Sequence, residues 1–187
     1  MDFKTARSNM VENQIRANKV TNLSVINAFK DVPREKFVPD PLQEISYVDE
    51  DIQLSRNRFM MKPMILARLF QSLNLQGNEN ILHVGSNTGY GSAILSRMCS
   101  SVISLESDKK LFEKSIHTFS NMGFDNVVPL HGSMESGVEK EAPFDIIFIE
   151  GSIETEPNGL FTQLNNNGKL IAIIRPVNIK IGKAKLF

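Results

Sequence analysis

The stretch Asn80–Gly91 constrains the fold more than any other part of the chain. It begins with a run suited to a buried strand, Ile81–Val84, continues through a glycine-punctuated turn and leads into an apolar helical pattern that starts at Ala93. A strand, a glycine-rich turn and a helix start can form a nucleotide cradle, because the backbone comes close to the ligand and helical N–H groups are free. Such turns also occur as plain connections, so the motif alone leaves both interpretations open.

Composition and charge narrow the class of protein. The chain has 187 residues, enough for one domain with a sizeable core, and its 41% hydrophobic and 22% charged residues are ordinary for a globular protein. Lys plus Arg and Asp plus Glu both number 21, which argues against a broad phosphate-binding surface and against nucleic acid as a partner. The single cysteine, Cys99, excludes an intrachain disulfide and the usual multi-cysteine zinc sites, so we expect a small buried residue there and no metal site.

Targeting signals are not evident in the sequence. The first 20 residues are polar and charged, unlike a signal peptide, and no window of about 18 apolar residues exists. We therefore expect a cytoplasmic protein without a membrane partner.

Strands and helices alternate after the glycine turn. Strands are predicted over 102–105, 126–130, 144–149 and 170–174. Between them, one helix is capped by Asp108 and stopped by Gly123, and a short helix over 157–164 ends in an Asn-rich turn, 165–168. This alternation predicts an α/β fold with a doubly wound, mostly parallel sheet and helices on both faces.

The N-terminal third has a different pattern. Helical periodicity covers 3–18, and a second helix follows, capped by Thr21 or Asn22 and ended by Pro33. Residues 40–62 show no clear period and are predicted to be a loop, which at this length is often functional.

These patterns predict one domain made of two parts. Residues 1–62 are expected to supply N-terminal helices and a substrate-side loop packed on the core. A helix begins at Pro63, and residues 63–187 form the α/β core. The last nine residues, 179–187, alternate like the start of a strand or hairpin arm, which suggests a core shortened relative to related chains.

The spacing of the glycines separates two kinds of nucleotide. A dinucleotide turn needs glycine at positions 85, 87 and 90, and the chain has only the first of the three. The G-x-G-x-G turn of S-adenosylmethionine (SAM) methyltransferases needs positions 85, 87 and 89. Gly85 and Gly89 match, and Asn87 is tolerable because Asn accepts left-handed backbone angles.

An acidic residue lies where a nucleotide ribose would bind. Glu106 ends the strand that follows the turn, 21 positions after Gly85. A carboxylate at this place can accept hydrogen bonds from both ribose hydroxyls, although a solvated charge at a strand end is the plainer interpretation.

A series of short segments occurs in the order of one known family. They are Val32–Pro39 (Val-Pro-Arg-Glu-Lys-Phe-Val-Pro), Tyr47 with Asp49, Pro63, the Gly85–Gly89 turn, Asn126-Val127, Gly132, Ala142–Asp145 and Leu164–Gly168. Over about residues 5–175 the chain resembles the protein-L-isoaspartate O-methyltransferase family. The resemblance implies SAM as cofactor and damaged proteins with isoaspartyl residues as substrates, whose carboxylate is methylated; the ester then collapses to a succinimide.

The chain departs from the family pattern on the substrate side. Met61 replaces a Ser that faces the substrate in the family, and Arg58-Phe59 replaces a Gln-Thr pair. Met cannot donate a hydrogen bond, so the family's substrate contact is missing. Ser55 is the nearest upstream hydroxyl, but nothing in the sequence places it in the site, and no catalytic residue is assigned.

Three cofactor-side positions also differ. His83 stands where the family has an acid two residues before the turn, Ser133 replaces an Asp that reaches the adenine, and Glu150 opens a stretch that is small and neutral in the family.

The candidate site combines the motif and the resemblance. Residues expected to line the cofactor are His83, Gly85, Ser86, Asn87, Thr88, Gly89, Glu106, Ser107, Gly132, Ser133 and Glu150. Residues expected on the substrate side are Arg58, Met61 and Pro63.

Each of three charged or titratable residues has a plainer interpretation. His83 can be a core residue bonded to backbone, Glu150 a solvated strand end, and Arg58 a surface residue.

Two functions follow from this sequence. The first is a SAM-dependent methyltransferase that acts on a carboxylate of damaged proteins or on a different carboxylate. The second is a catalytically weakened relative that binds SAM or a protein partner as a sensor or adaptor. An NAD-dependent oxidoreductase is disfavoured because the dinucleotide spacing fails. The oligomeric state is not predicted.

Overall fold

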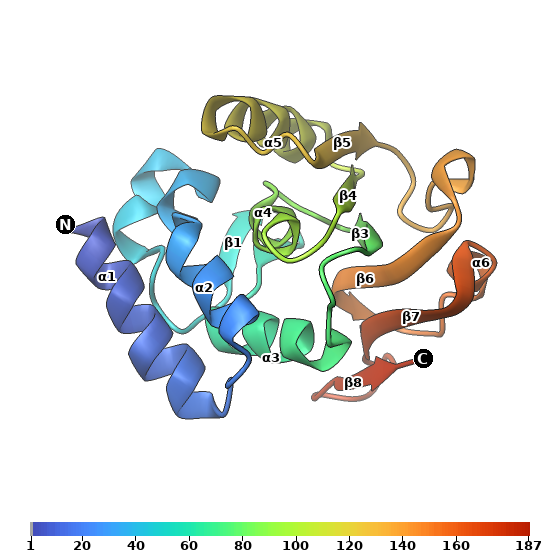
Figure 1. Ribbon diagram of the computed structural model, residues 1–187, viewed down its shortest axis with the longest axis horizontal. Helices are drawn as coiled ribbons and strands as arrows, with labels where there is room; N and C mark the ends of the chain where they lie inside the picture. Colours follow the sequence, from blue (N-terminus) through green and yellow to red (C-terminus); the bar gives the residue numbers. More distant parts are fainter. Residues whose placement is uncertain (1) are drawn as a thin grey trace.

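A computed structural model describes residues 2–187, and a six-stranded sheet lies at its centre (Figure 1). The α-helices are α1 Phe3–Met10, α2 Leu23–Asp31, α3 Pro63–Leu73, α4 Tyr90–Ser96, α5 Lys109–Met122 and α6 Asn158–Phe161. The strands are β1 Ile52–Ser55, β2 Arg58–Met60, β3 Asn80–Val84, β4 Ser101–Glu106, β5 Val127–His131, β6 Phe144–Ile153, β7 Leu164–Ile174 and β8 Lys183–Leu186. Short 3-10 turns lie at Arg16–Asn18, Arg34–Phe37, Asp40–Ile45 and Glu139–Glu141.

The order of strands in the sheet is β5-β4-β3-β6-β7-β8, in which β8 alone is antiparallel to its neighbour. The chain moves from β3 to β4 and β5 on one side, then returns to place β6 on the other side of β3. The order in which the strands are added therefore reverses between the parallel strands β3 and β6. Ligands of such sheets bind at this point, beyond the carboxyl ends of the strands. This topology confirms the predicted doubly wound α/β fold.

Local sequence signals place several helix ends as predicted. The Asn22 side chain accepts hydrogen bonds from the backbone N–H groups of Ser24 and Val25, so Asn22 is the cap of α2. Asp108 caps α5 in the same way, and Gly123 ends that helix with a φ of 68°. The predicted helix over 3–18 is one continuous helical run, in which a π-helical turn, Val11–Ile15, follows α1.

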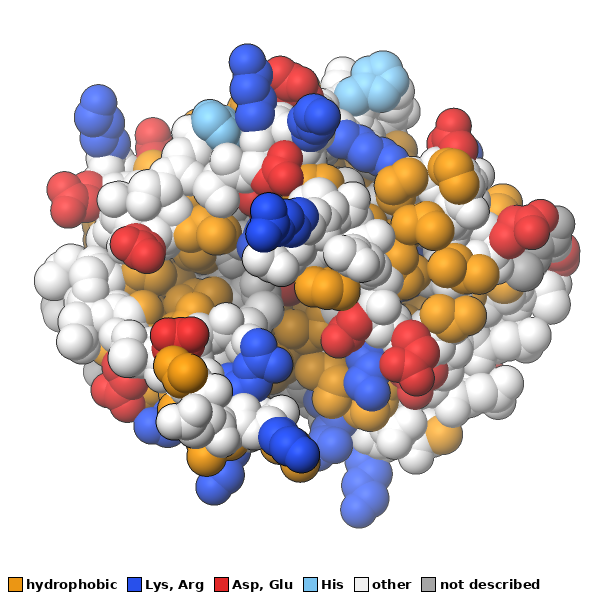
Figure 2. All heavy atoms as spheres, turned by 180° about the vertical axis from the view of Figure 1, so that it is seen from behind, with side chains coloured by type: hydrophobic (Ala, Val, Ile, Leu, Met, Phe, Trp, Pro, Cys, Tyr) orange, Lys and Arg blue, Asp and Glu red, His pale blue; other side chains and the backbone are white. Residues whose placement is uncertain are grey.

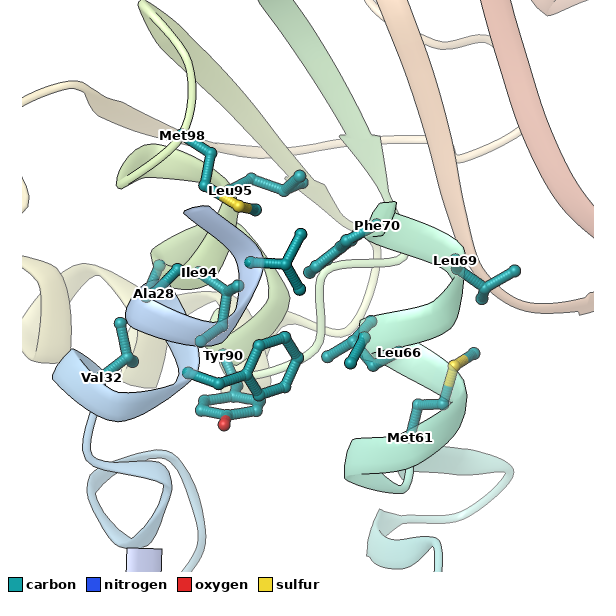
Figure 3. Packing of buried hydrophobic residues seen from close by; sticks show 14 of the residues in the cluster. Ala28, Val32, Met61, Leu66, Leu69, Phe70, Tyr90, Ile94, Leu95 and Met98 are labelled. Carbon is teal, nitrogen blue, oxygen red and sulfur yellow. The ribbon is translucent and has the colours of Figure 1, made fainter. Parts of the chain in front are cut away.

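Alternate residues of the strands enter two apolar clusters on opposite faces of the sheet. On one face, Ile81, Val102 and Phe148 pack with side chains of the N-terminal helices, α3 and α4. Figure 3 shows this packing, with α2, α3 and α4 meeting around Phe70 and Tyr90. The other face packs mainly against α6 and the segment between β5 and β6. Cys99 is buried as predicted, and burial raises the pKa of its thiol to about 12.

The prediction of a plain loop over 40–62 is wrong. This segment contains an antiparallel hairpin, β1–β2, whose register shifts between Gln53 and Ser55. Asn57 turns the chain with a φ of 61°, a left-handed angle that Asn accepts. The strands are three and four residues long, and only Ile52 and Met60 in them are buried, so no regular alternation marks the hairpin in the sequence.

Residues 165–168 do not end a helix as predicted. They form an irregularity inside β7, because β7 pairs with β6 first at Leu164 and again from Lys169 onward. The predicted strand or hairpin arm near the end of the chain is confirmed as β8, which pairs with β7. Among the described helices none has both the length and the apolar character needed to cross a membrane.

Candidate cofactor and substrate site

The glycine turn after β3 has the backbone of a close-approach loop. Gly85, Asn87 and Gly89 have φ values of 75°, 56° and 94°, so all three are left-handed. This confirms that Asn87 can replace a glycine of the G-x-G-x-G pattern. A side chain at Gly89 would collide with the Phe119 ring, whose nearest atom would lie 2.3 Å from the added Cβ. The backbone N–H groups of Gly85 and Ser86 bind the Leu105 carbonyl, which ties the turn to β4.

Glu106 is completely buried at the end of β4, beside the turn. One carboxylate oxygen accepts N–H groups of Ser107 and Asp108, both at 2.8 Å, and the other accepts the N–H of Asn87 at 2.7 Å. The alternative of a solvated strand-end charge is therefore wrong. Three backbone donors hold an ionised carboxylate in place, as a group that binds ribose hydroxyls requires.

The interpretation of Arg58 as a surface residue is wrong. It lies on β2, and its guanidinium Nη2 forms an ion pair with the Glu106 carboxylate. Only 18% of the Arg58 side chain is exposed. The guanidinium passes over the turn, because a Cβ added to Gly85 would lie 3.5 Å from Nη2. The hairpin therefore places a cation on the residue that is expected to hold the ribose.

The hairpin makes further polar contacts with this edge of the sheet. Ser55 donates its hydroxyl to the Asp108 carboxylate at 3.1 Å, and the Asn87 side-chain amide donates to the Phe59 carbonyl at 3.2 Å. These contacts explain the role of Ser55, which the sequence left unplaced: it fixes the hairpin and does not face the cleft.

His83 and Glu150 form a buried pair across neighbouring strands β3 and β6. Their Nε2 and Oε2 atoms are 3.0 Å apart, and the side chains are 0% and 3% exposed. His83 Nδ1 lies 2.7 Å from the Ser92 hydroxyl, which in turn donates to Ser104. The alternatives of a backbone-bonded His83 and a solvated Glu150 are both wrong. Gly91 makes room for the pair, because a Cβ there would lie 2.6 Å from Glu150 Oε2.

Met61 lies two residues before the first residue of α3, with its side chain on the same side of the helix as Leu69 (Figure 3). It is 7% exposed, and its backbone N–H donates to the Glu150 carboxylate at 3.4 Å. Met61 offers an apolar thioether where the family pattern has a hydroxyl. A hydrogen bond thus links the backbone of Met61, expected on the substrate side, to Glu150, expected on the cofactor side.

A cleft of about 1420 Å³ opens between the hairpin, the start of α3 and the carboxyl ends of β3 and β6. Arg58, Met61, Gly85, Asn87 and Glu150 line it. Figure 2 views the molecule from behind relative to Figure 1. It shows a hollow near the middle, with charged side chains of both signs around it. Glu106 does not line the cleft, whereas Arg58, which is paired with it, does.

The remaining predicted residues divide into two groups. Ser86, Thr88 and Gly89 are buried within the turn, and the Thr88 hydroxyl donates to the Phe37 carbonyl. Ser107, Gly132 and Ser133 follow the ends of β4 and β5 and do not line the cleft, and Ser107 and Ser133 are exposed. Pro63 is the first residue of α3 and is buried.

Arg34 is a site-shaping residue that the sequence interpretation missed. It is completely buried in the Val32–Pro39 segment, and it donates to the carbonyls of Ser46 at 2.7 Å and Met61 at 2.9 Å. Its guanidinium stacks over the Tyr90 ring at 4.8 Å. Burial raises the pKa of Tyr90 to about 12 and lowers the pKa of Arg34. The sequence signal that could have identified Arg34 is an arginine within a segment that two prolines bracket.

The residues present fit SAM. The left-handed turn carries no side chain at Gly85, and beside it Glu106 is a carboxylate that ribose hydroxyls can reach once the Arg58 guanidinium moves off it. The apolar wall at Met61 suits the region around a methyl group. Among the described residues, no group of three or more His, Cys, Asp and Glu side chains is arranged to hold a metal ion.

Comparisons with known proteins point to one family. Residues 5–184 match the model of the family described as protein-L-isoaspartate(D-aspartate) O-methyltransferase. Protein-L-isoaspartate O-methyltransferase 2 of Anaeromyxobacter sp. (strain Fw109-5) is 33% identical over 168 residues, which are 90% of this chain and 69% of that protein. The protein of the same description from Shewanella sediminis (strain HAW-EB3) is 33% identical over 169 residues, again 90% and 69%.

Two solved structures have the same fold. A protein-L-isoaspartate O-methyltransferase superposes with a TM-score of 0.84 at 25% identity, and the match covers 97% of this chain and 59% of that one. A putative protein-L-isoaspartate O-methyltransferase from Plasmodium falciparum, solved with S-adenosyl-L-homocysteine, gives a TM-score of 0.78 at 22% identity and covers 100% and 94% of the two chains.

Proposed function

Because the chain belongs to the protein-L-isoaspartate(D-aspartate) O-methyltransferase family, we propose that it binds SAM beside the β3 turn and methylates a carboxylate of isoaspartyl residues in damaged proteins. Family membership makes it a SAM-dependent O-methyltransferase. The observation that carries the assignment of the site is Glu106, a fully buried carboxylate held by three backbone N–H groups next to a left-handed glycine turn.

The reaction makes modest demands on the chain. A free carboxylate has a pKa of about 4, so it is already ionised and nucleophilic at neutral pH and needs no general base. When bound, SAM supplies a methyl group carried on a positively charged sulfur. The protein must therefore align the carboxylate oxygen with that methyl group and exclude water. Nothing in this requirement calls for His83 as a base, in line with its burial against Glu150.

The roles of the site residues follow from their positions. Gly85, Asn87 and Gly89 shape the turn that receives the cofactor, with Ser86 and Thr88 buried beneath it. Glu106 is assigned to the ribose hydroxyls, and Ser107, Gly132 and Ser133, which follow the neighbouring ends of β4 and β5, are assigned to the adenine. His83 and Glu150 hold the β3 and β6 ends together at the methionine end of the cofactor. Met61, Arg58 and Pro63 belong to the substrate side of the cleft.

Two observations favour a second candidate function. Met61 cannot donate a hydrogen bond, and the cation of Arg58 already lies on Glu106. Both features would weaken catalysis in a member of this family. The second candidate is therefore a SAM-binding sensor or adaptor, or a methyltransferase for a different carboxylate.

Calorimetry with SAM and S-adenosyl-L-homocysteine, paired with a methyl-transfer assay, separates these functions. The substrate is an isoaspartyl peptide, and the control is the peptide of identical sequence with ordinary aspartate. Binding with transfer to the isoaspartyl peptide alone is the expected result. Binding without transfer supports the second candidate, and absence of binding to both nucleosides contradicts the assignment of the site.

The substitution Met61→Ser tests the substrate side. It restores a hydroxyl at the position where the family has one, and a hydrogen bond of this kind contributes about 1 kcal/mol, or roughly a fivefold change. We expect kcat/KM for the isoaspartyl peptide to rise by about that factor, with SAM affinity unchanged. The control is Met61→Ala, which opens the same space without a hydroxyl. Equal rates for the Ser and Ala variants would show that the missing hydroxyl is not the main defect.

A further inference from the structure

The Arg58–Glu106 ion pair occupies the place that the cofactor ribose needs. A carboxylate has about four acceptor positions. In Glu106, three of them take backbone N–H groups, those of Asn87, Ser107 and Asp108, and the fourth donor is Arg58. The backbone donors belong to the turn and to the start of α5, so they are fixed parts of the fold. Arg58 is the only one of the four donors that can leave by a side-chain rotation.

The position of Arg58 makes it a competitor of the ribose. Its guanidinium lies over Gly85, in the space that the bare backbone of the turn provides. Arg58 lines the cleft together with Met61 and Glu150, whereas its partner Glu106 does not reach the cleft. A ribose hydroxyl can reach Glu106 only after the guanidinium has moved away. Another group of Arg58, Nε, is buried without a hydrogen-bond partner, so the closed position does not satisfy the whole guanidinium.

We propose that Arg58 has two positions: it covers Glu106 when no cofactor is bound, and after the ribose displaces it, it binds the substrate carboxylate in the cleft. This inference rests on the proposed function and adds a specificity residue to it. A guanidinium binds a carboxylate through two parallel N–H donors. Arg58 therefore supplies the donor that Met61 lacks, from a residue three positions earlier.

The two positions predict an order of binding. While Arg58 is paired with Glu106, it is not available to the substrate, so cofactor binding creates the substrate site. By linkage, the substrate must then raise the affinity for the cofactor by the same factor. A residue that merely stabilised Glu106 would produce no such coupling.

The test compares wild type, Arg58→Gln and Arg56→Gln by calorimetry. Gln is the residue of the family pattern at position 58. Arg56 is an exposed arginine in the turn of the same hairpin and forms no ion pair with any residue that the structure describes, so Arg56→Gln removes the same charge without touching Glu106. The first titrant is S-adenosyl-L-homocysteine. We expect roughly tenfold tighter binding to Arg58→Gln than to wild type, since the competing ion pair is gone, and no change for Arg56→Gln.

The second titrant is an isoaspartyl peptide, added with and without saturating S-adenosyl-L-homocysteine. Wild type should bind the peptide at least roughly tenfold more tightly when the nucleoside is present. Arg58→Gln should bind it weakly under both conditions. Because binding is measured, the result does not depend on turnover.

Several outcomes would overturn the inference. Equal or weaker nucleoside binding by Arg58→Gln would show that Arg58 supports the site and does not compete for it. If wild type bound the peptide with the same affinity with and without the nucleoside, Arg58 would have no second position on the substrate. If no variant bound the nucleoside, the proposed function itself would fail. If Arg58→Gln does not fold, Arg58→Lys serves as the second variant: it keeps a cation but loses the planar fork, and an unchanged affinity for the nucleoside would again contradict the inference.

Discussion

At the scale of single residues, the burial of Glu106 determines how this site can bind a ligand. Glu106 is a charge with no exposed surface, and such a charge is tolerated only where donors compensate for its lost hydration. Three backbone N–H groups and Arg58 do so. Replacing the side chain therefore removes an acceptor that the ribose needs and leaves the Arg58 guanidinium without its partner.

We expect Glu106→Ala to weaken binding of S-adenosyl-L-homocysteine by at least roughly tenfold, because hydrogen bonds to a charged group contribute about 1.5–3 kcal/mol. Calorimetry measures the change. The control is Glu113→Ala, which removes an exposed carboxylate of α5 that forms an ion pair with Lys109. Unchanged affinity in Glu106→Ala would refute the ribose assignment.

The sequence predicts properties of a single residue, but it does not predict contacts between residues that are far apart in the chain. Asn87 was correctly expected to accept a left-handed angle, because that preference belongs to the residue itself. The partner of Arg58 could not be predicted, since it lies 48 positions away on another strand. For the same reason, the pairing of His83 with Glu150 was invisible in the sequence. Composition and spacing carry no information on such contacts.

At the scale of elements, the β1–β2 hairpin and α5 meet at Asp108. This residue caps α5 by accepting the N–H groups of Lys110 and Leu111, and it also accepts the Ser55 hydroxyl of the hairpin. Partial burial alone would raise its pKa, but these three hydrogen bonds outweigh burial and hold the pKa of Asp108 below the usual 3.8. One side chain thus stabilises a helix and fixes the hairpin over the site.

Asp108→Ala should lower the free energy of unfolding by about 1 kcal/mol at neutral pH, as the loss of a helix cap does. Because the pKa of the folded state is lowered, the contribution is complete above the unfolded pKa. The difference from wild type should therefore shrink as the pH falls below 3.8 toward the pKa of the folded state. Urea titrations at several pH values measure it.

Asp108→Asn keeps a cap acceptor and is the matched control. It should lose less stability than Asp108→Ala at neutral pH, and it should show a weaker dependence on acidic pH. If the Ala and Asn variants were equally destabilised, the contribution would come from charge and not from the cap.

Elements with strong local signals were predicted, and weakly marked ones were not. The caps at Asn22 and Asp108 and the stop at Gly123 were correct because each depends on neighbouring residues. The hairpin over 52–60 was missed because its strands are short and its register is irregular. The start of β7 was also missed, since residues 165–168 resemble a turn and become part of a strand only through pairing with β6.

At the scale of the whole molecule, the N-terminal segment 1–62 and the core share one apolar cluster. The ring of Tyr90, on α4, lies 6.1 Å from Phe29 and 5.5 Å from Phe37, centroid to centroid. Tyr47 of the N-terminal segment packs on Phe3, and its hydroxyl donates to the Glu35 carboxylate. The doubly wound, mostly parallel sheet could be predicted from the alternation of elements, but this packing could not, because no periodicity relates the two parts.

We propose that both parts unfold together as a single domain. The chain has no Trp and two Tyr residues, which both lie in the N-terminal packing, whereas far-ultraviolet ellipticity reports on all helices and strands. Tyrosine fluorescence and ellipticity should therefore give the same urea midpoint. Two separate midpoints would contradict a single cooperative unit and assign residues 1–62 to a part that opens on its own.

The His83–Glu150 pair makes the identities of residues 83 and 150 depend on each other. An acid at position 83 would bury a second carboxylate beside Glu150, and like charges in one buried site are unfavourable, whereas a histidine there carries no such repulsion. Substitutions at the two positions are therefore not independent. A change of His83 to an acid costs less where Glu150 has been replaced as well.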